Sequence, residues 1–293
     1  MADRPDGVKQ RRSGRSSRMN SGAAPRRIGV KMHRDSNTRR RIVSLAPDVT
    51  SILFAIGGQD DLVGVSKWCK DVAPVGRLPR VGDCWKLEVE AVMRLRPTML
   101  VGSVPFAPET VAKLIALPAN FLALNPRSLL DIERNIRTLA SLVNRAAAGE
   151  KLISKMNRSF DNIRRAALRN RRRRRPCVYC EAWPNPRISS PPWVAEIVKL
   201  AGGDFALPAG TRLTDEQVAH AAPDVVVLAW TATGNRANPA RMLADKAFRN
   251  IPAVKNRRIV VIRDELLNTP GPPLMQGAHE IFRAIHSQSG ERG

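Results

Sequence analysis

The sequence has few of the residues on which metal and redox sites depend. Four cysteines and four histidines are spread over 293 residues, and only Cys177 and Cys180 lie close together. A structural zinc site needs a second close pair of ligands, and a redox pair normally opens a helix. These two cysteines instead lie in a β-branched, aromatic run that predicts a strand, where positions three apart face opposite sides. We therefore expect unreactive thiols and no metal site, with a Cys69–Cys84 disulfide as an alternative in an exported chain.

Long apolar runs are also missing. No stretch approaches the roughly 18 apolar residues that a transmembrane helix requires. Residues 1–41 contain no apolar segment of the kind found in signal peptides, although their Arg and Ser content leaves a transit peptide as an alternative. They are polar and basic throughout, so they bury too little apolar surface to offset the entropy of ordering. We expect a disordered tail over 1–41.

Acidic residues are outnumbered, and the excess of basic residues is local. The formal net charge is +23 and the pI about 11.3. Residues 1–41 carry 13 Lys and Arg against 3 Asp and Glu, and residues 164–175 carry 8 Arg and no acid. Such segments are typical of proteins that bind nucleic acid or another polyanion. Arginines also suit a solvated helix end, and we favour that interpretation for Arg169–Arg175. A nucleic-acid partner remains an alternative.

What is present from residue 41 onward is an alternation of strand and helix patterns. The pattern predicts an α/β fold with mostly parallel sheets. In the first half we expect strands at 41–45, 62–66, 98–102 and 120–124, and helices at 46–58, 87–96 and 107–117. In the second half we expect strands at 177–183, 224–230 and 258–262, and helices at 192–203, 214–222, 238–250 and 273–286.

Between these halves lie two long helical patterns, 128–143 and 146–170. The second has apolar residues along one face and would span roughly 35 Å, the length of a small domain. The segments EAVMRLRPTMLV (90–101) and EQVAHAAPDVVV (216–227) share a helix–Pro–strand layout. We therefore predict two similar Rossmann-like lobes joined by a rigid helix, with a ligand cleft between them. The predicted boundaries are a tail at 1–41, lobes at 42–127 and 176–293, and a helical region at 128–175.

Open α/β sheets bind ligands beyond the carboxyl ends of their strands. Those ends are predicted at 44–47, 66–69, 102–106, 181–183 and 229–231, and they carry small, polar or aromatic residues. The set contains no Ser/His/Asp combination, no pair of histidines with a carboxylate and no phosphate-binding loop. We therefore predict a binding protein without catalytic residues, cofactor or protein-bound metal.

Four blocks carry a family resemblance. RIVSLAPDVTSILFAIGGQDDLVGVSKWC, EAVMRLRPTMLVG, EAWPNP with PPWVAEIVKLAGG, and LNTPGPPLMQGAHEIF resemble the cobalamin-binding members of the helix-bridged substrate-binding proteins of ABC importers. The resemblance spans about 41–286. It implies capture of cobalamin or a related corrinoid and delivery to an importer permease, by a monomer in the periplasm or at the cell surface. The alternatives are haem or ferric-siderophore binding, or a polyanion-associated protein inside the cell if the chain begins where it is written.

The resemblance also implies contacts. By position, the carboxylates expected to meet the importer are Glu90 and Asp204, and Glu216 is a further surface carboxylate to consider. Most of the expected ligand contacts are aromatic: Pro47, Trp68, Phe106, Trp183 and Trp230 at the strand ends, and Trp85 just before the helix predicted at 87–96.

Overall fold

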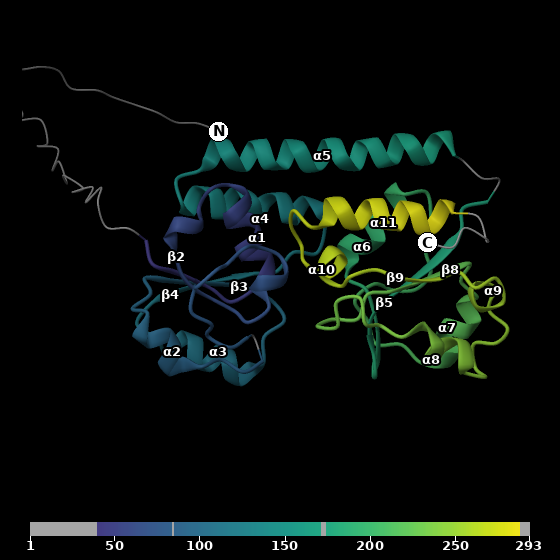
Figure 1. Cartoon of the computed structure of the whole chain (residues 1–293), viewed down its shortest axis with the longest axis horizontal. Coiled ribbons are helices and arrows are strands. Elements are labelled where there is room, and N and C mark those ends of the chain that lie inside the picture. Colours follow the sequence, from purple (N-terminus) through teal and green to yellow (C-terminus); the bar gives the residue numbers. More distant parts are fainter. Residues whose placement is uncertain (1–39, 84, 171–173, 288–293) are drawn as a thin grey trace, which may run out of the picture. The chain divides into compact units, whose positions relative to one another are not determined.

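The chain folds into two α/β lobes, and one long helix, α5 (Ala146–Arg169), runs along both of them (Figure 1). The computed structural model describes residues 40–83, 85–170 and 174–287. The tail predicted at 1–41 therefore falls outside the described residues, except for its last two. Of these, Arg41 donates hydrogen bonds from its guanidinium to the carbonyl oxygens of Leu95 and Arg96.

The first lobe is a four-stranded parallel sheet in the order β2–β1–β3–β4. Successive residues of β1 face opposite sides: Ile42 packs under α1, and Val43 packs under α2 and α3. Both faces of the sheet are therefore covered, as expected for a parallel sheet. The elements are β1 (Ile42–Ser44), α1 (Pro47–Ala55), β2 (Leu62–Val65), α2 (Val89–Arg94), β3 (Met99–Ser103), α3 (Pro108–Ile115) and β4 (Asn120–Leu124), with short 3-10 turns η1 (Gln59–Asp61) and η2 (Cys69–Asp71).

The second lobe repeats this plan. Its parallel strands follow the order β7–β5–β8–β9, and the antiparallel β6 extends the same edge of β5 that β7 pairs with. Strands β7, β5, β8 and β9 thus occupy the positions that β2, β1, β3 and β4 occupy in the first lobe, which confirms the internal repeat. The elements are β5 (Cys177–Pro184), β6 (Arg187–Ser189), α6 (Pro192–Leu200), β7 (Asp204–Phe205), α7 (Asp215–Ala221), β8 (Val225–Leu228), α8 (Pro239–Ala244), α9 (Pro252–Lys255), β9 (Ile259–Val261), α10 (Glu265–Asn268) and α11 (Leu274–His286).

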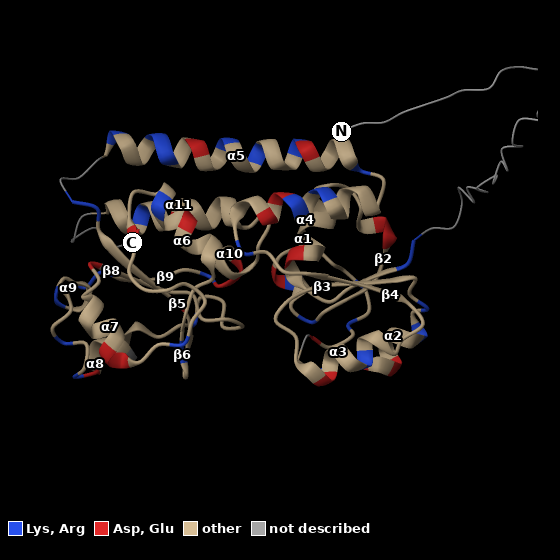
Figure 2. Ribbon diagram, turned by 180° about the vertical axis from the view of Figure 1, so that it is seen from behind, with Lys and Arg blue, Asp and Glu red and all other residues tan. Residues whose placement is uncertain are grey.

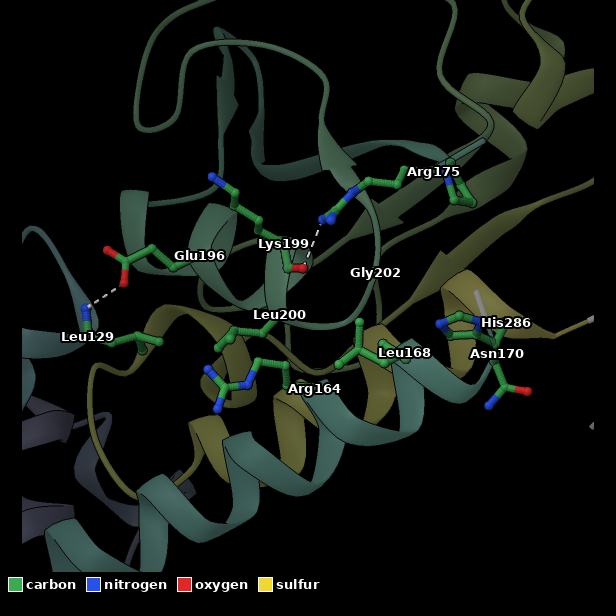
Figure 3. Close-up of a pocket in the computed structure, with 12 residues that line it drawn as sticks. Leu129, Arg164, Leu168, Asn170, Arg175, Glu196, Lys199, Leu200, Gly202 and His286 are labelled. Carbon is green, nitrogen blue, oxygen red and sulfur yellow. Dashed lines mark hydrogen bonds between the residues drawn. The ribbon is translucent and has the colours of Figure 1, made fainter. Parts of the chain in front are cut away.

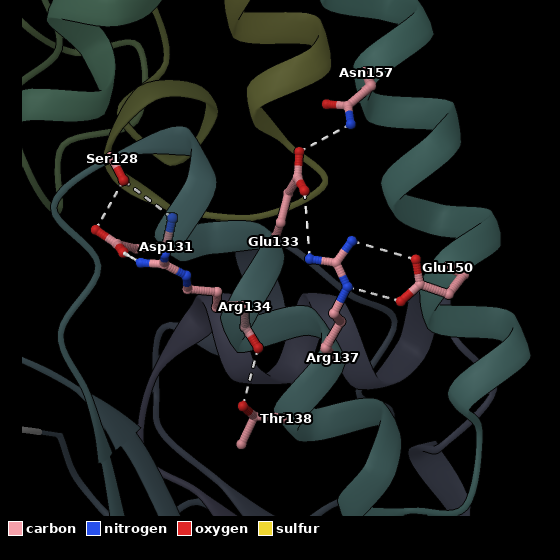
Figure 4. Close-up of polar contacts among 8 residues, drawn as sticks. All are labelled: Ser128, Asp131, Glu133, Arg134, Arg137, Thr138, Glu150 and Asn157. Carbon is pink, nitrogen blue, oxygen red and sulfur yellow. Dashed lines mark hydrogen bonds and ion pairs between the residues drawn. The ribbon is translucent and has the colours of Figure 1, made fainter.

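Helices α4 (Leu129–Leu142) and α5 (Ala146–Arg169) form the predicted bridge. The buried face of α5 packs on α4, which contacts α1 of the first lobe, and on α6 and α11 of the second. Polar contacts fix its register on α4 (Figure 4): Arg137 bonds to both Glu133 and Glu150, and the Asn157 amide donates to Glu133 at 2.9 Å. One helix is therefore packed against both lobes.

The cysteines follow the strand prediction. Cys180 is buried on the face of β5 that packs with α6, whereas the Cys177 sulfur lies 3.7 Å from the Ala221 carbonyl oxygen of α7 on the other side. Burial raises the pKa of both thiols, and most strongly that of Cys180, which keeps them protonated and unreactive. Cys84, the proposed disulfide partner of Cys69, lies outside the described residues. Within those residues no group of three His, Cys, Asp or Glu side chains is arranged to hold a metal ion.

Two predicted helices are shorter than expected. The helix predicted at 87–96 begins only at Val89, because Leu87 forms a bridge with Gly82, and it ends before Arg96, whose φ is 44°. The helix predicted at 238–250 ends at Ala244, because Asp245 is extended and its carboxylate accepts from the Ala247 amide at 2.9 Å. Local hydrogen bonds therefore override the helical pattern in both places. No described helix is both long enough and apolar enough to span a membrane.

The crossing of α4 and α5 gives a stability prediction. A Cβ on Gly149 would lie 2.6 Å from the Cβ of Ala140, so the two helices approach closely at this point. Gly149→Val should therefore lower the free energy of unfolding by roughly 1–3 kcal/mol, the usual cost of overpacking. Urea unfolding measures this. Ala147→Val, on the exposed side of the same turn, is the control and should cost less than about 1 kcal/mol. Equal losses would contradict the close packing.

Candidate functional site

A cavity of about 530 Å³ lies between the lobes, at the carboxyl ends of their strands. This volume is within the range of small-molecule sites, and the position is the one that open α/β sheets use. Segments that follow β1, β2, β8 and β9 contribute to it. Its lining residues are Pro47, Trp68, Lys70, Asp71, Val72, Trp85, Thr231, Ala232, Thr233, Gly234, Asn235, Arg236, Arg263, Asp264, Glu265, Asn268 and Thr269.

The first-lobe wall is built around the buried carboxylate of Asp83. It accepts hydrogen bonds from the Trp68 indole at 3.3 Å and from the backbone amides of Trp85 and Lys86 at 3.0 and 2.8 Å. Burial acts to raise the pKa of Asp83, but the hydrogen bonds from Lys67 and these amides outweigh it and hold the pKa below its usual range. Asp83 thus holds the Trp68 indole and the backbone at Trp85, whose side chain lines the cavity and remains 63% exposed.

The second-lobe wall is a loop organised by another carboxylate. Asp264 accepts from the backbone amides of Ala232 at 2.9 Å and Gly234 at 2.8 Å. Burial nevertheless raises the pKa of Asp264 above its usual range. The Asn268 amide holds the same segment by donating to the Ala229 carbonyl oxygen at 2.8 Å. The segment 231–236 therefore presents a shaped, polar surface opposite the tryptophans.

Beneath Pro47 lies a buried carboxyl group that sequence reasoning did not select. Asp48, in the first turn of α1, accepts a hydrogen bond from the Ser103 hydroxyl at the end of β3. Desolvation by burial raises the pKa of Asp48 to about 6, against the opposing effect of the Ser103 hydrogen bond. A buried carboxyl group that changes charge close to neutral pH therefore lies directly after Pro47, one of the cavity-lining residues.

The structure separates the six expected contacts into two groups. Pro47, Trp68 and Trp85 line the cavity together. Phe106, Trp183 and Trp230 are not among the lining residues, although each follows a strand end as expected.

Each of those three side chains has a different environment. Phe106 packs edge-on against Phe121, with ring centroids 5.6 Å apart. Trp183 lies at the end of β5, is 40% exposed, and donates its indole hydrogen to the Asn185 carbonyl oxygen at 2.8 Å. Trp230 is buried in the core of the second lobe. Burial leaves Trp230 no free ring face, so we no longer retain it as a ligand contact.

Glu181 explains the position of Trp230. Its fully buried carboxylate accepts from the Trp230 indole at 2.8 Å, from the Tyr179 hydroxyl at 2.8 Å and from the Arg187 guanidinium. Arg187 also bonds to Asp215 at 2.9 Å. Because each of these polar groups has a partner, the network holds the β5–β6 hairpin in one conformation. The sequence did carry a signal for this network, because Glu181 is a lone carboxylate in an apolar strand and Arg187 follows it six residues later.

A second hollow, of about 880 Å³, lies between α5, α6 and α11 (Figure 3). Pro176, which precedes β5, lines it, so the hollow is at the amino end of that strand. Parallel sheets do not use this end for ligands. Arg175 crosses it to the carbonyl oxygen of Lys199 at 2.8 Å, and Glu196 accepts from the Leu129 amide at 3.3 Å. We therefore take the smaller interlobe cavity as the ligand site.

The expected importer contacts occupy unlike positions. Glu90 is exposed in the first turn of α2, whereas Asp204 lies in β7 and forms an ion pair with Arg175 at 2.8 Å. Glu216 is exposed in the first turn of α7, which the internal repeat makes the counterpart of α2. The predicted capping box of Thr214 and Gln217 begins this helix. The structural equivalent of Glu90 is therefore Glu216.

Two lobes, a bridging helix and an interlobe cavity define a two-lobed substrate-binding protein. The family model described as periplasmic binding protein matches residues 42–266, and the chain belongs to that family. Its members bind solutes and are not enzymes, which confirms the prediction of a non-catalytic protein. The resemblance to the helix-bridged substrate-binding proteins of ABC importers is likewise confirmed.

Curated relatives and solved structures agree on this class. The chain is 25% identical to the vitamin B12-binding protein of Vibrio cholerae over 247 residues, covering 82% of this chain and 87% of the relative. It is 24% identical to an uncharacterised ABC transporter substrate-binding lipoprotein of Bacillus subtilis over 259 residues, 84% and 80% of the two chains. The fold matches the apo periplasmic heme-binding protein of Roseiflexus sp. RS-1 with a TM-score of 0.72 at 25% identity, over 85% and 98% of the chains. The structure of the vitamin B12-binding protein of Vibrio cholerae matches with a TM-score of 0.66 at 22% identity, over 84% and 96%.

Asp48 gives a prediction about pH. An acid whose pKa is raised by folding destabilises the fold once it ionises, so stability should fall as the pH rises from about 4 to about 6. Each pKa unit is worth about 1.4 kcal/mol, so the penalty at neutral pH is roughly 3 kcal/mol. Asp48→Asn keeps an acceptor for Ser103 and should be more stable than the wild type by up to that amount at pH 7.5.

Urea unfolding of both proteins at pH 7.5 and pH 4 measures the difference. The advantage of Asp48→Asn should shrink below about 1 kcal/mol at pH 4, because Asp48 is then protonated in the folded wild type and only partly ionised in the unfolded chain. Contributions from the other titrating groups cancel between the two proteins. An advantage that is the same at both pH values would contradict ionisation of Asp48 as its cause.

Proposed function

We propose that this protein captures cobalamin or a related corrinoid in the interlobe cavity and delivers it to an ABC importer. Family membership supports the transport role, and relatives named vitamin B12-binding proteins support the ligand class. The cavity wall supports it chemically. Asp83 holds the Trp68 indole and the backbone at Trp85, so two indoles offer aromatic surface to a broad, partly apolar ring, while the 231–236 segment offers amides and hydroxyls to its polar edge.

The observation that carries the choice of a corrinoid concerns the described residues that line the cavity, among which there is no typical haem-iron ligand. None of them bears an imidazole, thiol, thioether or phenol. Proteins hold haem iron through His, Cys, Met or Tyr. A corrinoid holds its cobalt in the ring and can carry its own axial ligand, so packing and hydrogen bonds suffice to bind it.

Haem is the second candidate. Several proteins of the same fold are named heme-binding, among them a periplasmic heme-binding protein from Pseudomonas aeruginosa with a TM-score of 0.74 at 22% identity. Lys70, Arg236 and Arg263 line the cavity and are suited to carboxylates such as those of haem or a ferric siderophore. Arg263 is already paired with Glu265. The cations therefore make anionic ligands the alternative to test.

For delivery we propose that the importer meets Glu90 on α2 and Glu216 on α7. The two helices are equivalents in the internal repeat, and both lie on the side of the molecule away from α5 (Figure 1). A pair of carboxylates at matched positions suits an importer with two equivalent halves, whereas Asp204 is already engaged by Arg175. We further propose a monomer that works on the outer side of the importer's membrane, in the periplasm or at the cell surface.

The ligand proposal predicts calorimetric titrations. Cyanocobalamin should bind the wild type, and Trp85→Ala should weaken binding by about 5- to 150-fold, because a stacked indole is worth roughly 1–3 kcal/mol. Trp183→Ala should have a smaller effect, because Trp183 does not line the cavity. Hemin should bind more weakly than cyanocobalamin.

A Cys84→Ser variant is the control for haem, since Cys84 precedes Trp85 in the sequence and lies outside the described residues. It should leave cyanocobalamin binding unchanged. Tighter binding of hemin than of cyanocobalamin would contradict the corrinoid assignment, and loss of hemin binding in Cys84→Ser would identify a thiolate ligand. A larger loss with Trp183→Ala than with Trp85→Ala would place the ligand on the β5–β6 hairpin instead.

A further inference from the structure

The outer face of α5 carries a straight row of basic side chains. The row contains Lys151, Lys155, Arg158, Arg165 and Arg169, all exposed and spaced four, three, seven and four residues apart. At about 100° per residue they fall within roughly 40° of one line along the helix, opposite the buried face. At about 1.5 Å per residue the row is roughly 27 Å long. We call these five residues the α5 stripe.

The acids of α5 do not neutralise the stripe. Glu150 is bound by Arg137 at 2.8 Å and Asp161 by Arg164 at 2.8 Å, and both acids lie beside the row. Among the residues that the structure describes, no carboxylate lies within ion-pair distance of a stripe side chain. Such an arrangement leaves five uncompensated positive charges in one line, which is unfavourable without an anionic partner.

The stripe lies on the edge of the molecule away from α2, α3, α7 and α8, and Figure 2 shows basic residues at intervals along the whole helix. No residue of α5 lines the interlobe cavity. At its end the stripe meets the hollow beside α6, where Leu168 is 65% exposed near Lys199. The face can therefore be occupied while the cavity stays uncovered, and because α2 and α7 lie on the opposite side, docking through the stripe would alternate with contact to an importer in the same bilayer.

The geometry of the stripe discriminates between polyanions. A helix in a nucleic-acid groove needs basic side chains on both flanks to reach the two phosphate walls, whereas this row is a single narrow line. A straight line of charges on an outward helix can contact a flat anionic surface along its whole length. Basic side chains near such a surface each add to binding, and an exposed leucine beside them can enter the interface. We propose that the α5 stripe docks the protein on an anionic lipid bilayer.

Vesicle co-sedimentation of the full chain tests the proposal. The vesicles are phosphatidylglycerol with phosphatidylcholine in equal amounts, or phosphatidylcholine alone, in about 0.1 M salt. The stripe variant has all five residues changed to Gln, a good helix former. The control variant has Arg77, Arg94, Lys113, Arg249 and Lys255 changed to Gln. These are also three arginines and two lysines, exposed and outside both cavities.

We expect the wild type to bind the anionic vesicles and not the neutral ones. The stripe variant should bind at least 30-fold more weakly, and the control variant less than 5-fold more weakly, because charges beyond the Debye length of about 10 Å are screened. Lys151→Arg with Lys155→Arg should bind normally. Circular dichroism should show the same helix content in every variant.

Three results would overturn the proposal. The first is no binding of the wild type to anionic vesicles, and the second is an equal loss in the stripe and control variants, which would reflect net charge alone. The third is tighter binding to a 30-base-pair duplex than to vesicles at the same salt, lost in the stripe variant, which would assign the stripe to nucleic acid. Cobalamin titrations do not enter this test, so it succeeds or fails independently of the ligand proposal.

Discussion

The packing of α5 across both lobes is the constraint on which the rest of the structure depends. Its buried face contacts α4 on the first-lobe side and α6 and α11 on the second-lobe side, and the close approach at Gly149 leaves little room to slide. Polar contacts from Arg137 and Asn157 set its register on α4. Since one helix positions both sheets, their carboxyl ends are held facing a common space, and the cavity exists because of that geometry rather than because of any residue within it.

Within that space, the cavity walls are shaped by carboxylates that bind backbone and indole groups of the protein itself. Asp83 holds the Trp68 indole and the backbone at Trp85, Asp264 holds the segment after β8, and Glu181 accepts from the buried Trp230 indole. Ordering these loops before the ligand arrives lowers the entropy cost of binding. The surface left to the ligand carries two tryptophans beside Lys70 and Asp71 on one side and is polar on the other, which suits a large ring with a polar periphery.

The alternation of apolar patterns was enough to predict the α/β class, the two lobes and the bridging helix, because long buried elements leave a clear period. Short elements such as β7 and α10 span two to four residues and leave none. Trp68 was placed at the cavity because strand ends mark the ligand edge, whereas the burial of Trp230 could not be read from its position, since its indole bonds to Glu181, 49 residues away. Asp83 did have a local signal, since Asp commonly accepts from amides two and three residues ahead in a turn.

We propose that the protein binds a corrinoid without supplying a ligand to its metal. Aquacobalamin tests this most directly, because its cobalt-bound water exchanges for any imidazole or thiolate within reach. The absorption spectrum of aquacobalamin bound to the wild-type protein should keep the band positions of the free compound. A shift to the spectrum of an imidazole- or thiolate-ligated cobalamin would contradict the claim, as would the absence of any complex.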